Sequence, residues 1–170
     1  MLVGKNLRIR ALEVDDLDWF TEWNNDINYT GEYEPVELSS RKSIEKWFND
    51  ESRNSWWVIE SMEAKPMGQM ITGPDGNHQF LGYIIHPNYR NKGYCTEAVE
   101  LMVDYLFLAK NIVRVQGEAS PENKASLRVL EKAGFTFEGV RRKVNFMHGR
   151  YNDGAIYSIL REEWTSKYLE

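Results

Sequence analysis

The most informative part of the chain is the polar stretch between residues 84 and 98, where an apolar strand-like run gives way to a helix-like run. Arg90 and Lys92 carry positive charge here, and Gly93 lets the backbone approach a ligand closely. Backbone N–H groups of such a turn, with the first N–H groups of the following helix, form a concave site for phosphate oxygens. The pattern predicts a pyrophosphate site. One glycine and two basic residues leave an ordinary strand-to-helix connection open as the alternative.

Metal and thiol chemistry find little support in the residue pattern. The three histidines, His78, His86 and His148, are dispersed, and Cys95 is the single cysteine. Neither has metal-ligand spacing, so we expect no metal site. Cys95 is expected to pack and not to act as a nucleophile, because nothing else in the sequence supports a nucleophilic role and a small buried thiol fits a packing role better.

A resemblance to a known family gives the polar stretch more weight. Arg90-x-x-Gly93-x-Cys95 resembles the R/Q-x-x-G-x-G/A signature of the GNAT acetyltransferases, with Cys95 departing from the usual Gly or Ala. The surrounding residues resemble the branch that acetylates the N-termini of ribosomal proteins, the RimJ/RimL-like branch. Blocks at residues 121–139 and 149–164 agree, so the resemblance covers about residues 80–164.

The resemblance implies acetyl-CoA as the cofactor. In similar proteins the pantetheine lies along the strand that ends here at His86, and the pyrophosphate lies on the amides from Asn91 to Thr96. The residues expected to contact acetyl-CoA are Ile84, Ile85, His86, Arg90, Asn91, Lys92, Gly93, Tyr94, Cys95, Thr96 and Asn123.

The implied reaction is direct attack of a neutral primary amine on the thioester, which needs a base, an oxyanion donor and help for the departing thiolate. The resemblance gives the backbone N–H of about Ile85 as the oxyanion donor. Many family members have a tyrosine seven residues after the motif asparagine, but Leu130 stands there in this chain. Asn123 and Ser126 remain able to hydrogen-bond the cofactor, although Asn123 could be only a helix cap.

The base and the acceptor site are less sharply indicated. Glu118, at a strand end beside the expected cleft, is the preferred base, through water, with a solvated carboxylate as the equal alternative. The acceptor site is expected to draw on residues near the final strands and on an acidic early loop, unless these are core aromatics and solvated surface. The candidates are Tyr151, Asp153, Tyr157, Glu32, Tyr33 and Glu34.

Hydrophobic periodicity predicts the elements that position these residues. Strands are expected at residues 7–12, 56–60, 67–72, 79–85, 113–118, 137–146 and 155–160. Helices are expected after Asp15 or Asp16, from Ser40, and at 96–108 and 124–133, with a long loop at 27–38 and turns at 74–76 and 148–149. The fold class is α+β with one βαβ unit. The GNAT resemblance implies a mixed, mostly antiparallel sheet of about seven strands flanked by about four helices, splayed between the fourth and fifth strands.

Composition limits the partners. The chain has 170 residues and a net charge of -5, which fits one GNAT domain over residues 1–170 and argues against nucleic-acid binding. No leader or membrane span is apparent. A single cysteine fits a reducing cytoplasm, and the protein is expected to be a monomer or a homodimer. The favoured acceptor is a protein N-terminus of the ribosomal-protein type. A polyamine, or an aminoglycoside or amino sugar, is the alternative: the acidic early loop suits a polyamine, but Leu130 speaks against a likeness to the tyrosine-assisted spermidine enzymes. A non-catalytic acyl-CoA-binding regulatory module is the alternative from another class.

Overall fold

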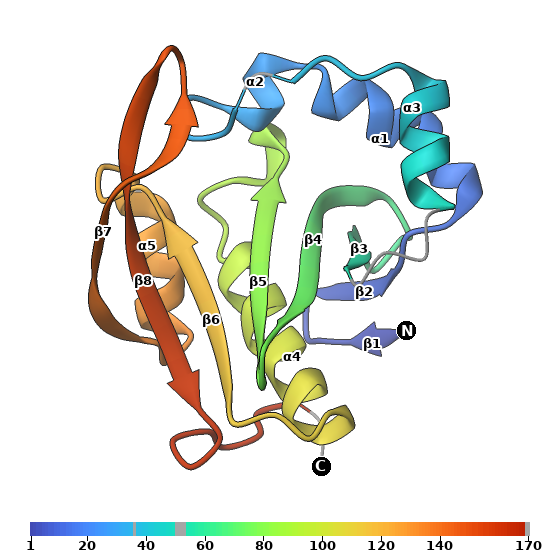
Figure 1. The fold of residues 1–170 in the computed structure, drawn as a ribbon. Coiled ribbons are helices and arrows are strands. Elements are labelled where there is room, and N and C mark those ends of the chain that lie inside the picture. Colours follow the sequence, from blue (N-terminus) through green and yellow to red (C-terminus); the bar gives the residue numbers. More distant parts are fainter. Residues whose placement is uncertain (36, 50–53, 169–170) are drawn as a thin grey trace.

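The computed structural model describes residues 1–35, 37–49 and 54–168. Within them, an eight-stranded sheet has the order β1-β2-β3-β4-β5-β6-β8-β7 (Figure 1). The strands are β1 (Leu2–Val3), β2 (Leu7–Ala11), β3 (Ser55–Ser61), β4 (Pro66–Asp75), β5 (His78–Ile85), β6 (Arg114–Ala119), β7 (Thr136–Met147) and β8 (Arg150–Leu160). The helices are α1 (Leu17–Asn24), α2 (Ile27–Thr30), α3 (Arg41–Phe48), α4 (Tyr94–Ala109) and α5 (Lys124–Lys132), with 3₁₀ turns η1 (Val14–Asp16) and η2 (Pro87–Tyr89).

The predicted α+β sheet is confirmed, with two short elements added. Every neighbouring pair is antiparallel except β5 and β6, which flank α4 in the expected βαβ unit. The short β1 and the one-turn α2 account for the extra strand and helix. The loop expected at 27–38 contains α2 because the Asp26 carboxylate caps the Asn28 N–H, and Gly31, with φ of 82°, ends that turn.

Several predicted boundaries differ from the structure, among them the start of α4 and the turn at 74–76. Helix α4 begins at Tyr94, two residues before Thr96, because Gly93 in the left-handed conformation is its N-cap. The turn expected at 74–76 instead centres on Gly76, and Pro74 continues β4 opposite Gln79. Strand β3 pairs with β4 only as far as Thr72, so the missing N–H of Pro74 breaks no ladder on that side.

The predicted splay lies between β5 and β6, which are the fourth and fifth of the seven strands expected from the sequence. Their parallel pairing runs only from Gln79–Val115 to Leu81–Gly117, after which β5 continues to Ile85 with no partner on its β6 side. Strand β6 turns away instead and pairs with β8 as far as Ala119. Half of β5 therefore presents backbone groups along one edge, where β6 would otherwise bond them.

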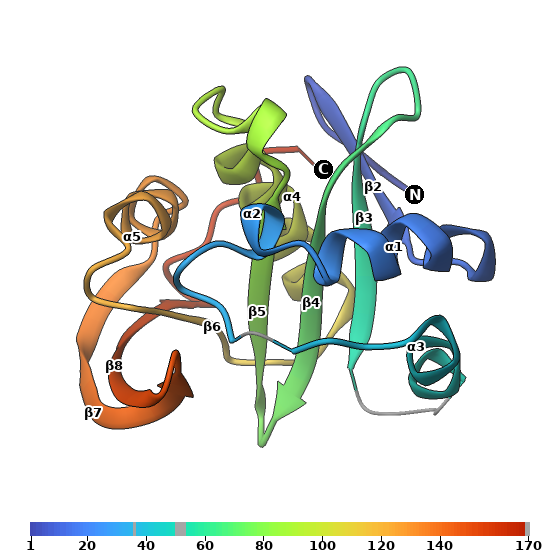
Figure 2. The same ribbon diagram turned by 90° about the horizontal axis from the view of Figure 1, so that it is seen from above.

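Helices cover both faces of the sheet. Adjacent residues Val58 and Ile59 of β3 point to opposite faces: Val58 packs in a cluster with α1 and α3, and Ile59 packs in the main core with α4. Figure 2 shows α4 and α3 on opposite sides of the central strands. The predicted apolar face of α4 is buried, and burial of each large side chain contributes roughly 1.5–3 kcal/mol.

Helix α4 is also held by the C-terminal segment. The buried Asp104 carboxylate accepts hydrogen bonds from Trp164 Nε1 at 2.7 Å and from the Lys167 and Tyr168 N–H groups, each at 2.8 Å. These contacts fix the helix whose N-terminus lies at the splay. No helix among the described residues is long and apolar enough to cross a membrane.

Candidate active site

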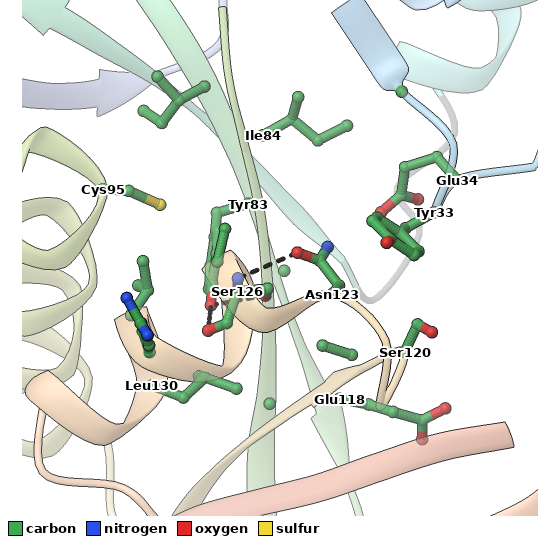
Figure 3. Close-up of a pocket in the computed structure, with 18 of the residues that line it drawn as sticks. Tyr33, Glu34, Tyr83, Ile84, Cys95, Glu118, Ser120, Asn123, Ser126 and Leu130 are labelled. Atoms are coloured by element: carbon green, nitrogen blue, oxygen red, sulfur yellow. Dashed lines mark hydrogen bonds between the residues drawn. The ribbon is translucent and has the colours of Figure 1, made fainter. Parts of the chain in front are cut away.

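A cleft of about 1150 Å³ opens where β5 and β6 diverge (Figure 3). Its walls come from β5, the β5–α4 turn, α4, β6, α5, β7 and the loop after α2. The structure brings most of the sequence-predicted residues to this cleft: Glu32, Tyr33, Glu34, Ile84, Ile85, Arg90, Asn91, Gly93, Tyr94, Cys95, Thr96, Glu118, Asn123 and Ser126. The remaining candidates, His86, Lys92, Tyr151, Asp153 and Tyr157, are not in its lining.

The β5–α4 turn is shaped by two left-handed residues. Asn91 has φ of 61° and Gly93 has φ of 83°, and a Cβ placed on Gly93 would meet nothing within 4 Å. The first i→i−4 bond of α4 runs from Glu97 N–H to Gly93 C=O, so the N–H groups of Tyr94, Cys95 and Thr96 precede the ladder. The turn therefore leaves an open cradle bounded by main-chain donors at a helix N-terminus, which suits a phosphate.

The basic side chains of this turn donate hydrogen bonds to backbone carbonyl groups of the protein. Arg90 Nε donates to Ile85 C=O at 2.9 Å, and its Nη2 donates to Tyr29 C=O at 2.7 Å, which ties α2 to the end of β5. Lys92 Nζ donates to Asn88 C=O at 3.0 Å and lies 5.7 Å from the centre of the Tyr89 ring. Their expected contacts with the cofactor stay a prediction. The structure itself shows a cradle built from backbone.

His86 also has a local role. Its Nδ1 accepts from Asn88 N–H at 3.3 Å, and its ring centre lies 4.7 Å from that of Trp23. The imidazole therefore caps η2 and packs against α1, outside the cleft lining. The backbone of His86 still follows Ile85 directly, so its expected contact with the pantetheine through the backbone stays a prediction.

A basic stripe on α5 was missed in the sequence. Lys124, Arg128 and Lys132 all line the cleft, and Lys124 Nζ also donates to Pro121 C=O at 2.7 Å. Their i, i+4, i+8 spacing puts them on one face of α5 and could have indicated an anion-facing helix. Because these side chains add positive charge across the cleft from the α4 N-terminus, they favour a polyanionic occupant.

The Ile85 N–H points to the open edge of β5. His86 N–H donates to Met67 C=O of β4 at 2.8 Å, and successive residues of a strand direct their N–H groups to opposite sides. Ile85 N–H is therefore turned away from β4, toward the cleft. This orientation is the one that the predicted oxyanion donor needs.

Polar and thiol groups meet beneath that edge. Tyr83 Oη donates to Ser126 C=O at 3.1 Å and lies 3.0 Å from Ser126 Oγ, and Asn123 Oδ1 accepts from Ser126 N–H at 3.1 Å (Figure 3). Asn123 is thus a helix cap, whatever else it contacts. Burial raises the pKa of the Cys95 thiol to about 12, which keeps it protonated and unreactive.

Glu118 lines the cleft but is already engaged. Its Oε1 accepts from Asn145 Nδ2 at 2.7 Å, its Oε2 accepts from Arg141 Nη2, and its side chain is 20% exposed. A Cβ at Gly154 would collide with this carboxylate, so the glycine makes room for it to cross β8. Glu118 fastens the end of β6 to β7, and its service as the base stays a prediction.

The loop after α2 forms the opposite wall. Tyr33 Oη donates to Glu122 C=O at 3.3 Å, which joins the loop to the β6–α5 connection across the cleft. Glu34 is exposed, yet desolvation by the protein around its carboxyl group raises its pKa to about 7. An acidic and aromatic wall of this kind favours a cation.

The three acceptor candidates on β8 lie elsewhere. Tyr157 is buried and its Oη donates to Glu131 Oε1 at 3.1 Å, while Asp153 Oδ1 accepts from Lys143 N–H at 2.9 Å. Tyr151 is exposed and packs on Phe146, with ring centres 5.1 Å apart. The irregular pairing of β7 between Arg141 and Asn145 instead brings its neighbours to the cleft: Val144, Asn145, Phe146 and Met147.

The splay, the backbone cradle and the strand order agree with comparisons to known proteins. The family model described as "Acetyltransferase (GNAT) domain" matches residues 6–136, and the chain belongs to this family. It is an N-acetyltransferase that uses acetyl-CoA, and the open Gly93 cradle, the turned-out Ile85 N–H and the α5 cations fit that cofactor.

Relatives and solved structures cover nearly the whole chain. The uncharacterized N-acetyltransferase YnaD of Bacillus subtilis is 30% identical over 96% of this chain and 98% of its own. A spermidine N-acetyltransferase from Vibrio cholerae, solved in complex with CoA and spermine, is 25% identical with a TM-score of 0.83, covering 92% of this chain and 96% of that chain. RimL, a ribosomal L7/L12 α-N-protein acetyltransferase solved with CoA, has a TM-score of 0.82 at 15% identity over 93% of this chain and 96% of its own, which shows a shared fold alone.

Proposed function

We propose that this chain transfers the acetyl group of acetyl-CoA to a primary amine of a small polycation, with a polyamine as the favoured acceptor. The observation that carries this is the division of one cleft into a cationic, backbone-lined end and an acidic, aromatic end. The first end suits the phosphates of the cofactor, and the second suits several positive charges on a slender chain.

At the cofactor end, the protein supplies position and charge. When bound, acetyl-CoA supplies the activated thioester. The N–H groups from Asn91 to Thr96 hold phosphate oxygens, Gly93 keeps that surface free of side chains, and Lys124 and Arg128 of α5 add charge from the other wall. The open edge of β5 accepts the pantetheine as a strand-like partner.

Two groups of this chain assist the reacting thioester, one at its carbonyl oxygen and one at its sulfur. Ile85 N–H donates to the carbonyl oxygen of the thioester, which gains negative charge as the amine adds. Ser126, at the first turn of α5, offers its hydroxyl to the departing sulfur. Both positions follow from the splay, since β5 and α5 lie on its two sides.

At the acceptor end, Glu34 binds the amine and takes its proton. A carboxyl group with a pKa near 7 is partly ionised at neutral pH, so it can both attract a cation and accept a proton, directly or through water. Glu32 and Tyr33 contribute a second charge and an aromatic face to the same wall. Glu118 remains the competing base, although Arg141 and Asn145 occupy its two oxygens.

This polyamine acceptor differs from the acceptor expected from the sequence. The resemblance of the residues around Gly93 to the ribosomal-protein branch favours a protein N-terminus instead. Two observations support the polyamine. The Tyr33–Glu122 contact joins the loop after α2 to the β6–α5 connection across the cleft, and a thin chain fits beside such a bridge more readily than a folded partner. The Vibrio cholerae relative, solved with spermine, has this fold at 25% identity.

The test is thiol release from acetyl-CoA with a panel of amines. Spermidine and spermine are compared with peptides that begin with Ser or Ala, with an aminoglycoside, and with butylamine as the singly charged control. We expect saturable turnover with the polyamines and a KM at least about tenfold higher for butylamine, because it lacks the second charge. Turnover with peptides alone would restore the protein N-terminus as acceptor. CoA binding without turnover of any amine would support the regulatory module.

A further inference from the structure

Tyr83 is a cleft residue that the reaction described above does not use. It lies on β5 beside the open edge, and its ring reaches across to the first turn of α5. Its hydroxyl is within hydrogen-bond distance of two atoms of one residue, Ser126 C=O at 3.1 Å and Ser126 Oγ at 3.0 Å (Figure 3). Both side chains line the cleft.

The place on α5 where many family members carry a tyrosine holds an apolar side chain in this chain. Leu130 is buried, and a Cβ added to Gly117 of β6 would lie 2.8 Å from Leu130 Cδ2. Leu130 therefore fills the base of the splay and offers the departing sulfur no hydrogen. Tyr83 brings a phenol toward the same region from β5, one turn of α5 earlier.

A tyrosine hydroxyl has one hydrogen to give, so Tyr83 can donate to the Ser126 carbonyl or to Ser126 Oγ, but not to both. When Tyr83 donates to the carbonyl, Ser126 Oγ–H can donate to Tyr83. When Tyr83 donates to Oγ, the Ser126 hydrogen is released to point elsewhere. The pair thus has two arrangements that differ only in the rotation of two O–H bonds.

We propose that Tyr83 is a positioning residue that orients the Ser126 hydroxyl toward the sulfur that leaves acetyl-CoA. The bond between the amine nitrogen and the acetyl carbon forms, the C–S bond breaks, and its electron pair goes to sulfur. Tyr83 O–H then donates to Ser126 Oγ, and Ser126 O–H donates to the thiolate. Both hydroxyls keep their protons, and the thiolate is protonated from solvent as CoA departs.

The surroundings of Tyr83 suit donation without ionisation. Burial raises the pKa of Tyr83 well above its ordinary value, with the neighbouring Cys95 acting in the same direction. The phenol therefore stays protonated throughout the working range of the enzyme. A donor that never ionises can hold Ser126 but cannot itself supply a proton at each turnover.

The inference rests on the proposed acetyl transfer but not on the identity of the acceptor, so its test uses the cofactor product alone. CoA is bound to the wild type and to the variants Y83F, S126A, Y83F/S126A and Y105F. The pKa of its bound thiol is then read from the ultraviolet absorbance of the thiolate against pH. Y105F is the matched control, because Tyr105 lies on α4 with its ring against Trp57, away from the cleft lining.

We expect the wild type to lower the pKa of the bound CoA thiol relative to free CoA, and Y83F and S126A each to bring it back toward the free value. With any accepted amine, kcat is expected to fall about tenfold in Y83F, with the dissociation constant of acetyl-CoA unchanged. The double variant should be no worse than S126A, since Tyr83 acts through Ser126. Y105F should match the wild type in both measurements.

The overturning results are separate from those of the proposed function. A bound thiol with the same pKa in wild type and Y83F overturns the positioning role, even if polyamines are acetylated. A Y83F loss that adds fully to that of S126A also overturns it, because the two residues would then act independently. A lowered thiol pKa in the wild type, lost in Y83F, sustains the inference even if no polyamine is turned over.

Discussion

The two ends of the cleft differ in the groups that line them: mainly backbone groups at the cofactor end, and side chains at the acceptor end. At the cofactor end, the left-handed Gly93, the N-terminus of α4 and the free edge of β5 present backbone groups, while Arg90 and Lys92 bond to the protein itself. At the acceptor end, the wall consists of side chains, from the loop after α2 and from β7, that are far apart in the chain. Cofactor binding by backbone groups should therefore tolerate many side-chain substitutions. Acceptor binding should depend on which carboxylate side chains are present.

This difference predicts where a substitution acts. A change at the cofactor end matters when it fills the cradle or moves the backbone. A change at the acceptor end matters when it alters charge, and it should leave the affinity for acetyl-CoA alone. The four experiments below divide the cleft along this line.

The largest effect is expected from Gly93→Glu. The added side chain enters the open cradle and puts a carboxylate against the phosphates, so CoA binding should be lost by calorimetric titration. Gly76→Glu is the control, because Gly76 also has a positive φ, 64°, and open space around it, but lies in the β4–β5 turn. Equal loss of CoA binding in both variants would attribute the effect to backbone strain and contradict the cradle.

The cofactor end was predictable from sequence for a physical reason. Its residues are contiguous, and a glycine between a strand and a helix determines the local backbone whatever surrounds it. The fold was predictable for the same kind of reason, since strand and helix periodicity is local. The two additions, β1 and α2, are too short to show periodicity.

The acceptor end could be predicted only in part. Glu32, Tyr33 and Glu34 were found because acidic and aromatic residues cluster in one loop. Their position across the cleft depends on a contact between Tyr33 and Glu122, which are 89 residues apart. Tyr157 lies with Ala155 and Ile159 on the inward face of β8, so it packs in the core and its hydroxyl meets Glu131 of α5, which is the core role that the sequence left open for these aromatics.

The second largest effect is expected from Glu34→Gln. Removing the charge while keeping the shape should raise the KM for spermidine about tenfold and leave the KM for acetyl-CoA unchanged, in steady-state kinetics with each substrate varied. Glu22→Gln, at an exposed position of α1, is the control and should behave as the wild type. A rise in both KM values would mean that Glu34 supports the whole cleft and does not belong to the acceptor end alone.

A smaller effect follows from the raised pKa of Glu34. The carboxylate fraction falls as the pH drops through about 7, so a bis-quaternary ammonium inhibitor, whose charge is independent of pH, should bind more weakly at acid pH. Its inhibition constant should decrease about fivefold as the pH rises through this range, then level off. Glu34→Gln should give a flat profile. An unchanged slope in that variant would assign the titration to another group of the cleft.

The smallest effect on turnover is expected from Glu118→Gln, and it separates the two candidate bases. Since Arg141 and Asn145 already occupy its oxygens, the change should lower kcat less than about threefold, keep the pH profile, and lower Tm by about 2–4 °C. Glu138→Gln is matched to it, because Glu138 bonds Arg114 at 2.6 Å outside the cleft lining. It should lose stability alone. If kcat in Glu118→Gln instead falls about a hundredfold or more and the limb of the pH profile near neutrality disappears, Glu118 is the base and Glu34 only binds the acceptor.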